Sequence, residues 1–312
     1  MTVSILDPAH PDLALMATMD GISDSSLVDQ SGTLAAGTIS GATTAAGLQG
    51  DALIYDGNDY VAFQSDSEAA LAFVHTTGMF HIATWVKFNN SNGGTLQAML
   101  GNTPVSTADK GFGLLADDRS ASGANRALLF AIVKGTSGVA VASLSINNAI
   151  PDDTDYHLYE LSGDGAAVTA FVDGQQLVGS APIGALGSGN TTRPLSFGRV
   201  SHASATYNMA GGQDVTRFWR RPLTESERAQ VLEEPRPYQI SGTVTQDGAP
   251  FATEIRLYDA TTGALVDIIS SDAAGAYQKA LSTADPVYAM SIPSAGYRPL
   301  VHGPISPALK VT

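Results

Sequence analysis

The feature that most restricts the fold of this chain is a two-residue alternation of side chains in short runs. In the segment 79–88, Phe80, Ile82, Thr84, Val86 and Phe88 fall on one face of an extended chain. Comparable runs, each bounded by Gly, Asn, Asp or Ser, cover residues 52–63, 126–135, 156–163 and 167–178. Because a period of two is the signature of a β-strand, the sequence predicts an all-β protein. The segment VDGQ (172–175) predicts a hairpin turn with Asp-Gly at its centre.

One stretch predicts a helix, and it separates two regions. Thr224 and Glu227 form a T-x-x-E capping box at the start of residues 224–234. Pro235 and Pro237 end this helix, so we place a domain boundary there. The sequence predicts a domain over residues 1–235, with an N-terminal arm over 1–12, and a second domain over 236–312.

The second region contains shorter strand patterns. They cover residues 240–245, 252–259, 264–270, 276–281 and 286–292, with turn sequences between them. Five short strands in about 60 residues predict a small β-sandwich of the transthyretin or immunoglobulin kind. The proline-containing segment 296–307 predicts an edge strand followed by an irregular tail.

Five blocks in the first region carry a family resemblance. They are the opening ATMDG…DGNDYVAF (17–63), FHIATWVKF (80–88), YHLYELSGDG (156–165), AVTAFVDGQQL (167–177) and GGQDVTRFWRRPLTESERAQVL (211–232). In this order, they resemble LamG-like jelly-roll domains of the concanavalin A-like lectin and glucanase superfamily. This resemblance implies a concanavalin A-like jelly-roll sandwich over residues 13–234.

A second resemblance covers residues 238–301. ISGTVTQDGAP, RLYDATTGAL and SDAAGAY resemble the carboxypeptidase regulatory-like, transthyretin-type β-sandwich. A lectin-like domain followed by this small domain resembles bacteriophage tail and virion components. Fold alone does not determine function, so this last step is an association.

Composition excludes several classes of protein. The formal net charge of −14 argues against binding nucleic acid, which requires clustered Lys and Arg. No run of 18 apolar residues occurs, so we expect no membrane insertion. The N-terminus has no basic region followed by an apolar one, and we expect no Sec signal peptide. The absence of cysteine excludes disulfides and thiolate zinc sites.

The sequence predicts no enzyme. The paired carboxylates of related glucanases, in the pattern E-x-D-x-x-E, are not found. The adjacent pairs Asp117–Asp118, Asp152–Asp153 and Glu233–Glu234 would point to opposite faces of an extended chain. We interpret them as solvated loop or helix-end residues.

Calcium is the metal that the resemblance implies. LamG-like domains often hold Ca²⁺ where the first and last strands meet, and the matching positions here are Asp20 and Asp214. The family usually has two acidic residues in the closing motif, whereas this chain has Gln213 before Asp214. The alternative is that Asp20 and Asp214 are turn residues that accept backbone hydrogen bonds. The oxygen-rich turn 56–59 is expected to join a hairpin.

A sugar site requires an aromatic ring beside polar side chains in loops. His202, Tyr207 and Asn208 are the candidates for glycan binding, together with the loop 188–193. The alternative is that all of them are ordinary loop residues. Trp85 and Trp219 are expected to be core residues.

An arginine cluster precedes the predicted helix. Arg217, Arg220 and Arg221 are expected to pair with Glu225, Glu227 and Glu233; the alternative is a docking patch for an acidic partner.

These observations favour a non-enzymatic bacteriophage virion accessory protein, at the tail or on the capsid surface. We expect it to be made in the host cytoplasm and located in the virion. Its expected partners are other virion proteins, further copies of itself and a bacterial surface polysaccharide. The alternatives are a bacterial secreted glycan-binding protein, an accessory module of a glycoside hydrolase, and an active glycanase with an unfamiliar carboxylate pair.

Overall fold

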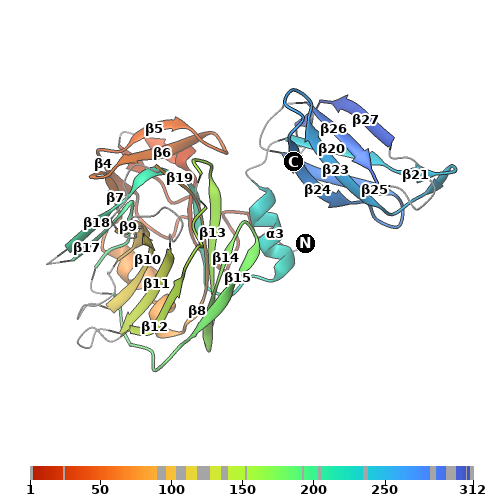
Figure 1. Ribbon diagram of the computed structural model, residues 1–312. Coiled ribbons are helices and arrows are strands. Elements are labelled where there is room, and N and C mark those ends of the chain that lie inside the picture. Colours follow the sequence, from red (N-terminus) through yellow and green to blue (C-terminus); the bar gives the residue numbers. More distant parts are fainter. Residues whose placement is uncertain are drawn as a thin grey trace. The chain divides into compact units, whose positions relative to one another are not determined.

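A computed structural model shows the all-β fold that the sequence predicts, a jelly-roll sandwich followed by a small sandwich (Figure 1). It describes residues 3–23, 25–89, 96–102, 110–117, 127–134, 140–151, 153–191, 193–202, 205–234, 238–281, 286–292, 300–306 and 308–309. These residues form two compact units, the large unit Met1–Leu232 and the small unit Glu233–Thr312. Within the described ranges, no helix is long and apolar enough to cross a membrane.

The first sheet of the large unit is antiparallel and contains the central strand β8. Its order is β15-β14-β13-β8-β19-β6-β5, and β1 pairs with β19. The strands are β1 (Leu13–Ala17), β5 (Thr43–Ala46), β6 (Asp51–Asp56), β8 (Met79–Phe88), β13 (His157–Asp164), β14 (Ala167–Val172), β15 (Gln175–Pro182) and β19 (Ala210–Trp219).

The second sheet lies against the first, in the order β12-β11-β10-β9-β16-β7-β4-β3-β2. Its strands are β2 (Ile22–Ser23), β3 (Ser26–Leu27), β4 (Gly37–Ser40), β7 (Tyr60–Ala62), β9 (Leu96–Gly101), β10 (Lys110–Asp117), β11 (Ala127–Lys134), β12 (Ala140–Ile146) and β16 (Ser196–Phe197). A separate hairpin consists of β17 (Arg199–His202) and β18 (Ala205–Asn208). The helices are η1 (Met19–Gly21), α1 (Asp66–Ala70), α2 (Phe73–Thr76) and α3 (Glu225–Glu233).

The alternation in β8 is confirmed, but both of its faces are buried. Phe80 and Ile82 belong to the main core between the sheets, whereas Ala83 and Trp85 belong to a second cluster on the outer face of the first sheet. That outer face is covered because apolar side chains from both ends of the large unit join the same cluster: Ile5 from the N-terminal segment, Leu13 from β1, Leu223 before α3 and Val231 from α3. Trp85 and Trp219 are therefore buried, as expected.

Two turn predictions have different outcomes. The Asp173-Gly174 turn is confirmed, since β14 pairs with β15 and both turn residues have positive φ. The hairpin expected at residues 56–59 is wrong, because β6 lies in the first sheet and β7 in the second. The Asp59 carboxylate accepts a hydrogen bond from the backbone N–H of Asp56 at 2.9 Å, which stabilises a turn between the two sheets.

The small unit is a second sandwich with its own core. One sheet has the order β25-β20-β28 and the other β24-β23-β26-β27, beside a short hairpin of β21 and β22. The strands are β20 (Tyr238–Thr243), β21 (Thr245–Gln246), β22 (Ala249–Pro250), β23 (Glu254–Asp259), β24 (Leu265–Ser270), β25 (Ala276–Leu281), β26 (Val287–Ser291), β27 (Leu300–Ile305) and β28 (Ala308–Leu309). The expected edge strand is confirmed as β27, but the tail expected to be irregular contributes β28, which pairs with β20.

Candidate functional site

Asp20 and Asp214 lie on either side of one loop, residues 47–50, in the large unit. The Asp214 carboxylate on β19 accepts hydrogen bonds from the N–H groups of Leu48 at 2.7 Å and Gln49 at 3.1 Å. Asp20, in η1, accepts one from the N–H of Asp51 at 2.7 Å. The alternative role, backbone hydrogen bonding, is therefore present at both carboxylates.

The loop approaches these carboxylates closely because it contains two glycines. A β-carbon at Gly50 would overlap the Asp20 carboxylate, and one at Gly47 would overlap that of Asp214. Gly50 also has a φ of +66°, which L side chains rarely adopt. Both positions therefore need glycine, because only a residue without a side chain lets the loop backbone lie this close to Asp20 and Asp214.

The charge of Asp214 is poorly compensated. Burial raises its pKa to about 6 and the charge of Asp20 contributes to the rise, although the hydrogen bonds from Gln49, Leu48 and Val215 act in the opposite direction. The side-chain oxygen of Gln49 is also buried without a hydrogen-bond partner. Asp20 and Asp214 bring two carboxylates to one loop, and carboxylate oxygens are ligands that Ca²⁺ prefers.

Gln213 does not belong to this donor set. Its side-chain oxygen accepts a hydrogen bond from the Tyr55 hydroxyl at 3.2 Å, and its amide donates to Thr84 and Thr216. In the pairing of β19 with β8, the register shifts between Gln213 and Thr216, and Asp214 lies within this irregular part of the strand. Among the described residues, no group of three or more His, Asp or Glu side chains could hold a metal ion.

The three glycan candidates lie on the β17–β18 hairpin. Tyr207 is half-buried and packs against a small cluster of Ala98, Leu115 and Val200. Asn208 pairs with Arg199, and its side-chain oxygen is buried without a partner. His202 ends β17, and its side chain lies outside the described residues. The structure therefore places Tyr207 and Asn208 on one strand, with the Tyr207 ring partly used in packing.

Other sequence candidates are placed as follows. Of the adjacent acidic pairs, Asp118 and Asp152 lie outside the described residues, and Glu233 ends α3. In the loop 188–193, the backbone oxygens of Ser188 and Gly189 contact Lys110 and His75, respectively.

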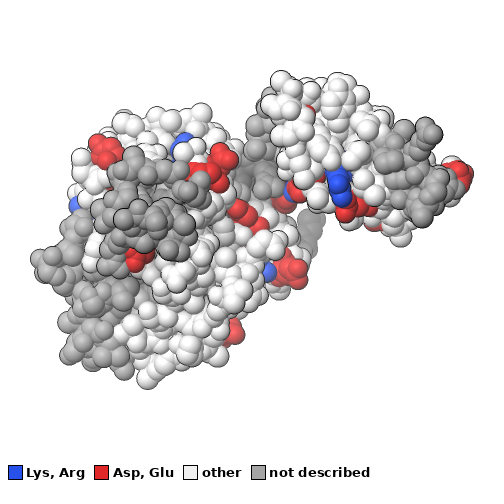
Figure 2. Space-filling view, viewed as in Figure 1, with Lys and Arg blue, Asp and Glu red and all other residues white. Residues whose placement is uncertain are grey.

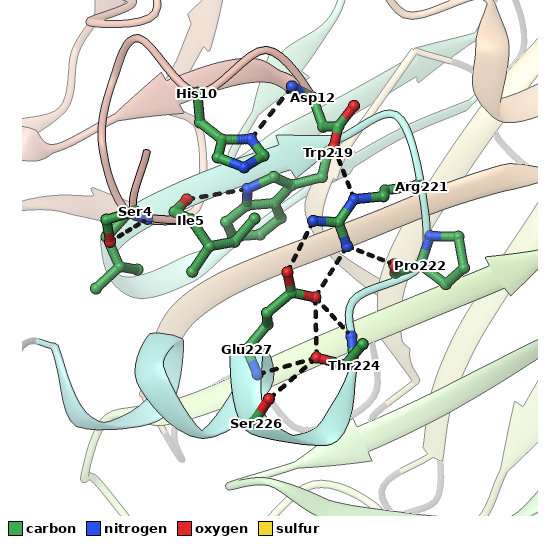
Figure 3. A network of polar contacts seen from close by, with 11 residues as sticks. Ser4, Ile5, His10, Asp12, Trp219, Arg221, Pro222, Thr224, Ser226 and Glu227 are labelled. Carbon is green, nitrogen blue, oxygen red and sulfur yellow. Dashed lines mark hydrogen bonds and ion pairs between the residues drawn. The ribbon is translucent and has the colours of Figure 1, made fainter. Parts of the chain in front are cut away.

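The expected ion pairing of the arginine cluster is confirmed in part. Arg221 bonds Glu227 through two nitrogens, at 2.8 and 2.9 Å, and Asp12 at 2.7 Å (Figure 3). Arg220 donates to the backbone oxygen of Leu13, and Arg217 is buried. These contacts join α3 and the N-terminal segment to Arg220 and Arg221, directly after β19. The same region holds the Trp219 indole N–H, which donates to the Ile5 oxygen at 3.2 Å.

Two polar groups centred on β13 were not predicted from the sequence, one at Glu160 and one at His157. His81 Nε2 lies 3.1 Å from Glu160 Oε1, and both side chains are fully buried, so solvent and substrate have no access to them. His157 lies between Asp173 at 2.6 Å and Asp153 at 2.9 Å. The sequence signals near these groups are the Asp173-Gly174 turn and the acidic pair Asp152–Asp153, neither of which predicts a partner on another strand.

Acidic side chains are spread over both units on the face drawn in Figure 2, and basic ones are few. This distribution agrees with the net charge of −14.

Comparisons with known proteins show the fold. No protein-family model and no curated protein matches the sequence. The structure is similar to the binding domain of Paraclostridial Mosquitocidal Protein 1, with a TM-score of 0.51, 12% identity, and coverage of 96% of this chain and 73% of that one. It is also similar to Trypanosoma rangeli sialidase in complex with 2,3-difluorosialic acid, with a TM-score of 0.51, 15% identity, and coverage of 72% and 33%. A third similar structure is Domain 4 of AbnA, a GH43 extracellular arabinanase from Geobacillus stearothermophilus, in complex with arabinotriose, with a TM-score of 0.46, 14% identity, and coverage of 71% and 98%.

Proposed function

We propose that this chain is a non-enzymatic glycan-binding protein of a bacteriophage virion, in which the large unit binds Ca²⁺ and a bacterial surface polysaccharide. The observation that carries the proposal is the loop 47–50, whose backbone lies against the carboxylates of both Asp20 and Asp214. A cation there would offset the electrostatic repulsion between the carboxylates of Asp20 and Asp214. It would also fix the loop where η1 approaches β6.

The Ca²⁺ would act as a structural ion. When bound, it supplies positive charge and orients oxygen ligands, and the chain's own residues contact the sugar. Tyr207 would supply a ring edge for this contact, with His202 of the same hairpin as a further candidate. Asn208 follows Tyr207 on β18, so its amide faces the opposite side of the strand and would serve a separate contact. The neighbouring structures support a binding role through the toxin domain, which its description names as a binding domain, and through the sialidase, which holds a sialic acid derivative.

The virion part of the proposal is supported by domain order. A large jelly-roll sandwich followed by a small sandwich is the arrangement that the sequence resemblance implies for tail and virion components. We propose that the protein is located in the virion, contacts other virion proteins and forms a homo-oligomer. Mass spectrometry of purified phage particles tests the location, and light scattering of the purified chain tests the oligomer.

A second candidate is an accessory module of a glycoside hydrolase or a secreted glycan-binding protein. It is favoured by the sialidase comparison, in which this chain matches 33% of a longer enzyme. Absence of the chain from purified particles, together with glycan binding, would favour this candidate.

The test of glycan binding is an array of bacterial polysaccharides probed with the full chain, in Ca²⁺ and in chelator. We expect binding that chelator abolishes and that Asp20→Asn weakens at least about tenfold, because one of two charged ligands is lost. Glu68→Gln, which removes a negative charge from α1, is the matched control. Binding unaffected by chelator would remove the metal from the proposal, and absence of binding would contradict the glycan-binding role.

The same polysaccharides test the non-enzymatic assignment. The full chain is incubated with each one that it binds, and reducing ends are measured over time. We expect no release above that of a heat-unfolded sample. Sustained release would show an active glycanase.

A further inference from the structure

The small unit contains a cleft between its two sheets. Its volume is about 470 Å³, and its lining includes Gly242, Ile255, Tyr277, Ala289, Ser291 and His302. Pockets of roughly 300–1,000 Å³ accommodate drug-sized ligands. The cleft is therefore large enough for one or two sugar rings.

Strand register places two polar side chains on the cleft side of their sheet, where Ser291 is half-buried and His302 is exposed at the mouth of the cleft. Ser291 pairs with Ile255, and His302 pairs with Ala289. Ile255 and Ala289 are buried in the core of the small unit. Because directly paired residues share a face of a sheet, Ser291 and His302 lie on the same side as Ile255 and Ala289, the side that lines the cleft. Both polar side chains are therefore accessible to a ligand in the cleft.

The opposite wall is formed by Tyr277, which pairs with Gly242. A β-carbon at Gly242 would crowd the outer end of the Tyr277 ring, including its hydroxyl oxygen. The missing side chain therefore leaves room for the ring to lie along the wall. Burial raises the pKa of Tyr277, so its hydroxyl remains a neutral hydrogen-bonding group.

The chemistry of the lining favours an uncharged ligand. It combines the rings of Phe251 and Tyr277 with the hydroxyls of Thr243 and Ser291. No described residue of the lining is Lys or Arg, and Asp247 contributes a carboxylate. An anionic ligand would find no permanent cation in this set. A neutral sugar ring matches it, because its C–H face packs on an aromatic ring and its hydroxyls both donate and accept hydrogen bonds.

We propose that the cleft of the small unit binds a neutral saccharide, with a sugar ring against Tyr277 and its hydroxyls bonded by Ser291 and His302. This site is separate from the one proposed for the large unit and does not depend on Ca²⁺. Binding measured with and without chelator therefore separates the two proposals, because only binding by the large unit is expected to need Ca²⁺.

The experiment is saturation-transfer difference NMR on the full chain with maltose, cellobiose and lactose as neutral probes and sialyllactose as an acidic one. We expect transfer to at least one neutral probe, in chelator as well as in Ca²⁺. Tyr277→Ala should weaken binding about tenfold, and Ser291→Ala, which removes only a hydroxyl, about threefold. Tyr258→Ala is the matched control, because Tyr258 follows the core residue Leu257 on β23 and faces away from the cleft.

Circular dichroism tests whether each variant folds. If Tyr277→Ala does not fold, Ser291→Ala still provides the test, because it removes only a hydroxyl. Absence of transfer to all neutral probes would overturn the proposal. So would equal transfer in wild type and both cleft variants, or preference for sialyllactose. Transfer that chelator abolishes would assign the binding to the large unit instead.

Discussion

His157 is held between two carboxylates and illustrates how a single side chain can link stability to pH. Burial lowers its pKa, but the hydrogen bonds to Asp173 and Asp153 and their negative charges more than compensate and raise it to about 9. Because the folded pKa lies above the unfolded value of about 6.5, the stabilisation is complete below about pH 6.5 and is lost as pH rises through about 9.

We predict that His157→Gln lowers the free energy of unfolding of the large unit by about 1–2 kcal/mol at about pH 6, after discounting for the partly exposed carboxylates. The difference between wild type and variant should shrink as pH approaches about 9.5, where His157 is largely neutral in the folded state and neutral in the unfolded state. Urea unfolding at the two pH values measures this. A pH-independent difference would mean that His157 contributes by packing alone.

Asp214 changes stability in the same direction as His157, but at lower pH. Its folded pKa of about 6 lies above the ordinary value of 3.8, so ionisation destabilises the fold as pH rises through this interval. Bound Ca²⁺ would relieve that cost. We predict that Ca²⁺ raises the melting temperature of the large unit, and raises it more at about pH 7.5 than at about pH 5, where protons compete for the ligand.

Asp20→Asn checks the origin of this effect, since an amide oxygen can still accept the hydrogen bond from Asp51. The variant should fold and lose most of its response to Ca²⁺. An unchanged response would place the metal elsewhere in the molecule.

Among the elements, α3 depends on specific polar contacts. It has only nine residues, and its capping box is reciprocal: Thr224 Oγ1 accepts from the Glu227 N–H, while Glu227 Oε2 accepts from the Thr224 N–H. Hydrogen bonds from Arg221 lower the pKa of Glu227 to about 2, with further contributions from Thr224. The stabilisation is present above about pH 4.5 and is lost as pH falls toward 2.

We predict that Glu227→Gln costs about 1–2 kcal/mol at pH near 7, less than the pKa shift alone implies because the pair is partly exposed to solvent. Thr224→Ala should cost about 1 kcal/mol through loss of the cap. Urea unfolding measures both, and repeating it at about pH 3 should reduce the cost of Glu227→Gln. Equal costs at both pH values would show that the carboxylate charge does not stabilise α3.

Strand positions could be predicted locally, but pairings could not. The alternation in β8 identifies a strand because every second side chain faces the main core. It cannot show that Trp85, on the other face, is covered by Ile5 and Val231, since these residues come from the two ends of the large unit. Similarly, the turn after β6 has a hairpin sequence, yet the strand that follows it, β7, lies in the other sheet. The Asp59 carboxylate stabilises this turn through its hydrogen bond from Asp56.

At the scale of the whole molecule, the candidate site could be predicted only from the resemblance to LamG-like domains. Asp20 and Asp214 are far apart in the chain, and neither spacing nor composition brings them to one loop. The role of Gly47 and Gly50 is visible only once the loop backbone is seen against the carboxylates. The polar lining of the cleft in the small unit depends on the pairing of β26 with β27, which a strand pattern does not specify.

Each unit has its own buried clusters, and this organisation predicts two unfolding transitions. The clusters of the large unit contain residues up to Leu232, while that of the small unit begins at Ile240. Leu257→Ala should destabilise the small unit by about 3 kcal/mol, since Leu257 is fully buried in its core. Differential scanning calorimetry should show that this variant lowers one transition, while Ca²⁺ raises the other. A single transition that responds to both changes would mean that the two cores unfold cooperatively, and stability could then not be assigned to either unit alone.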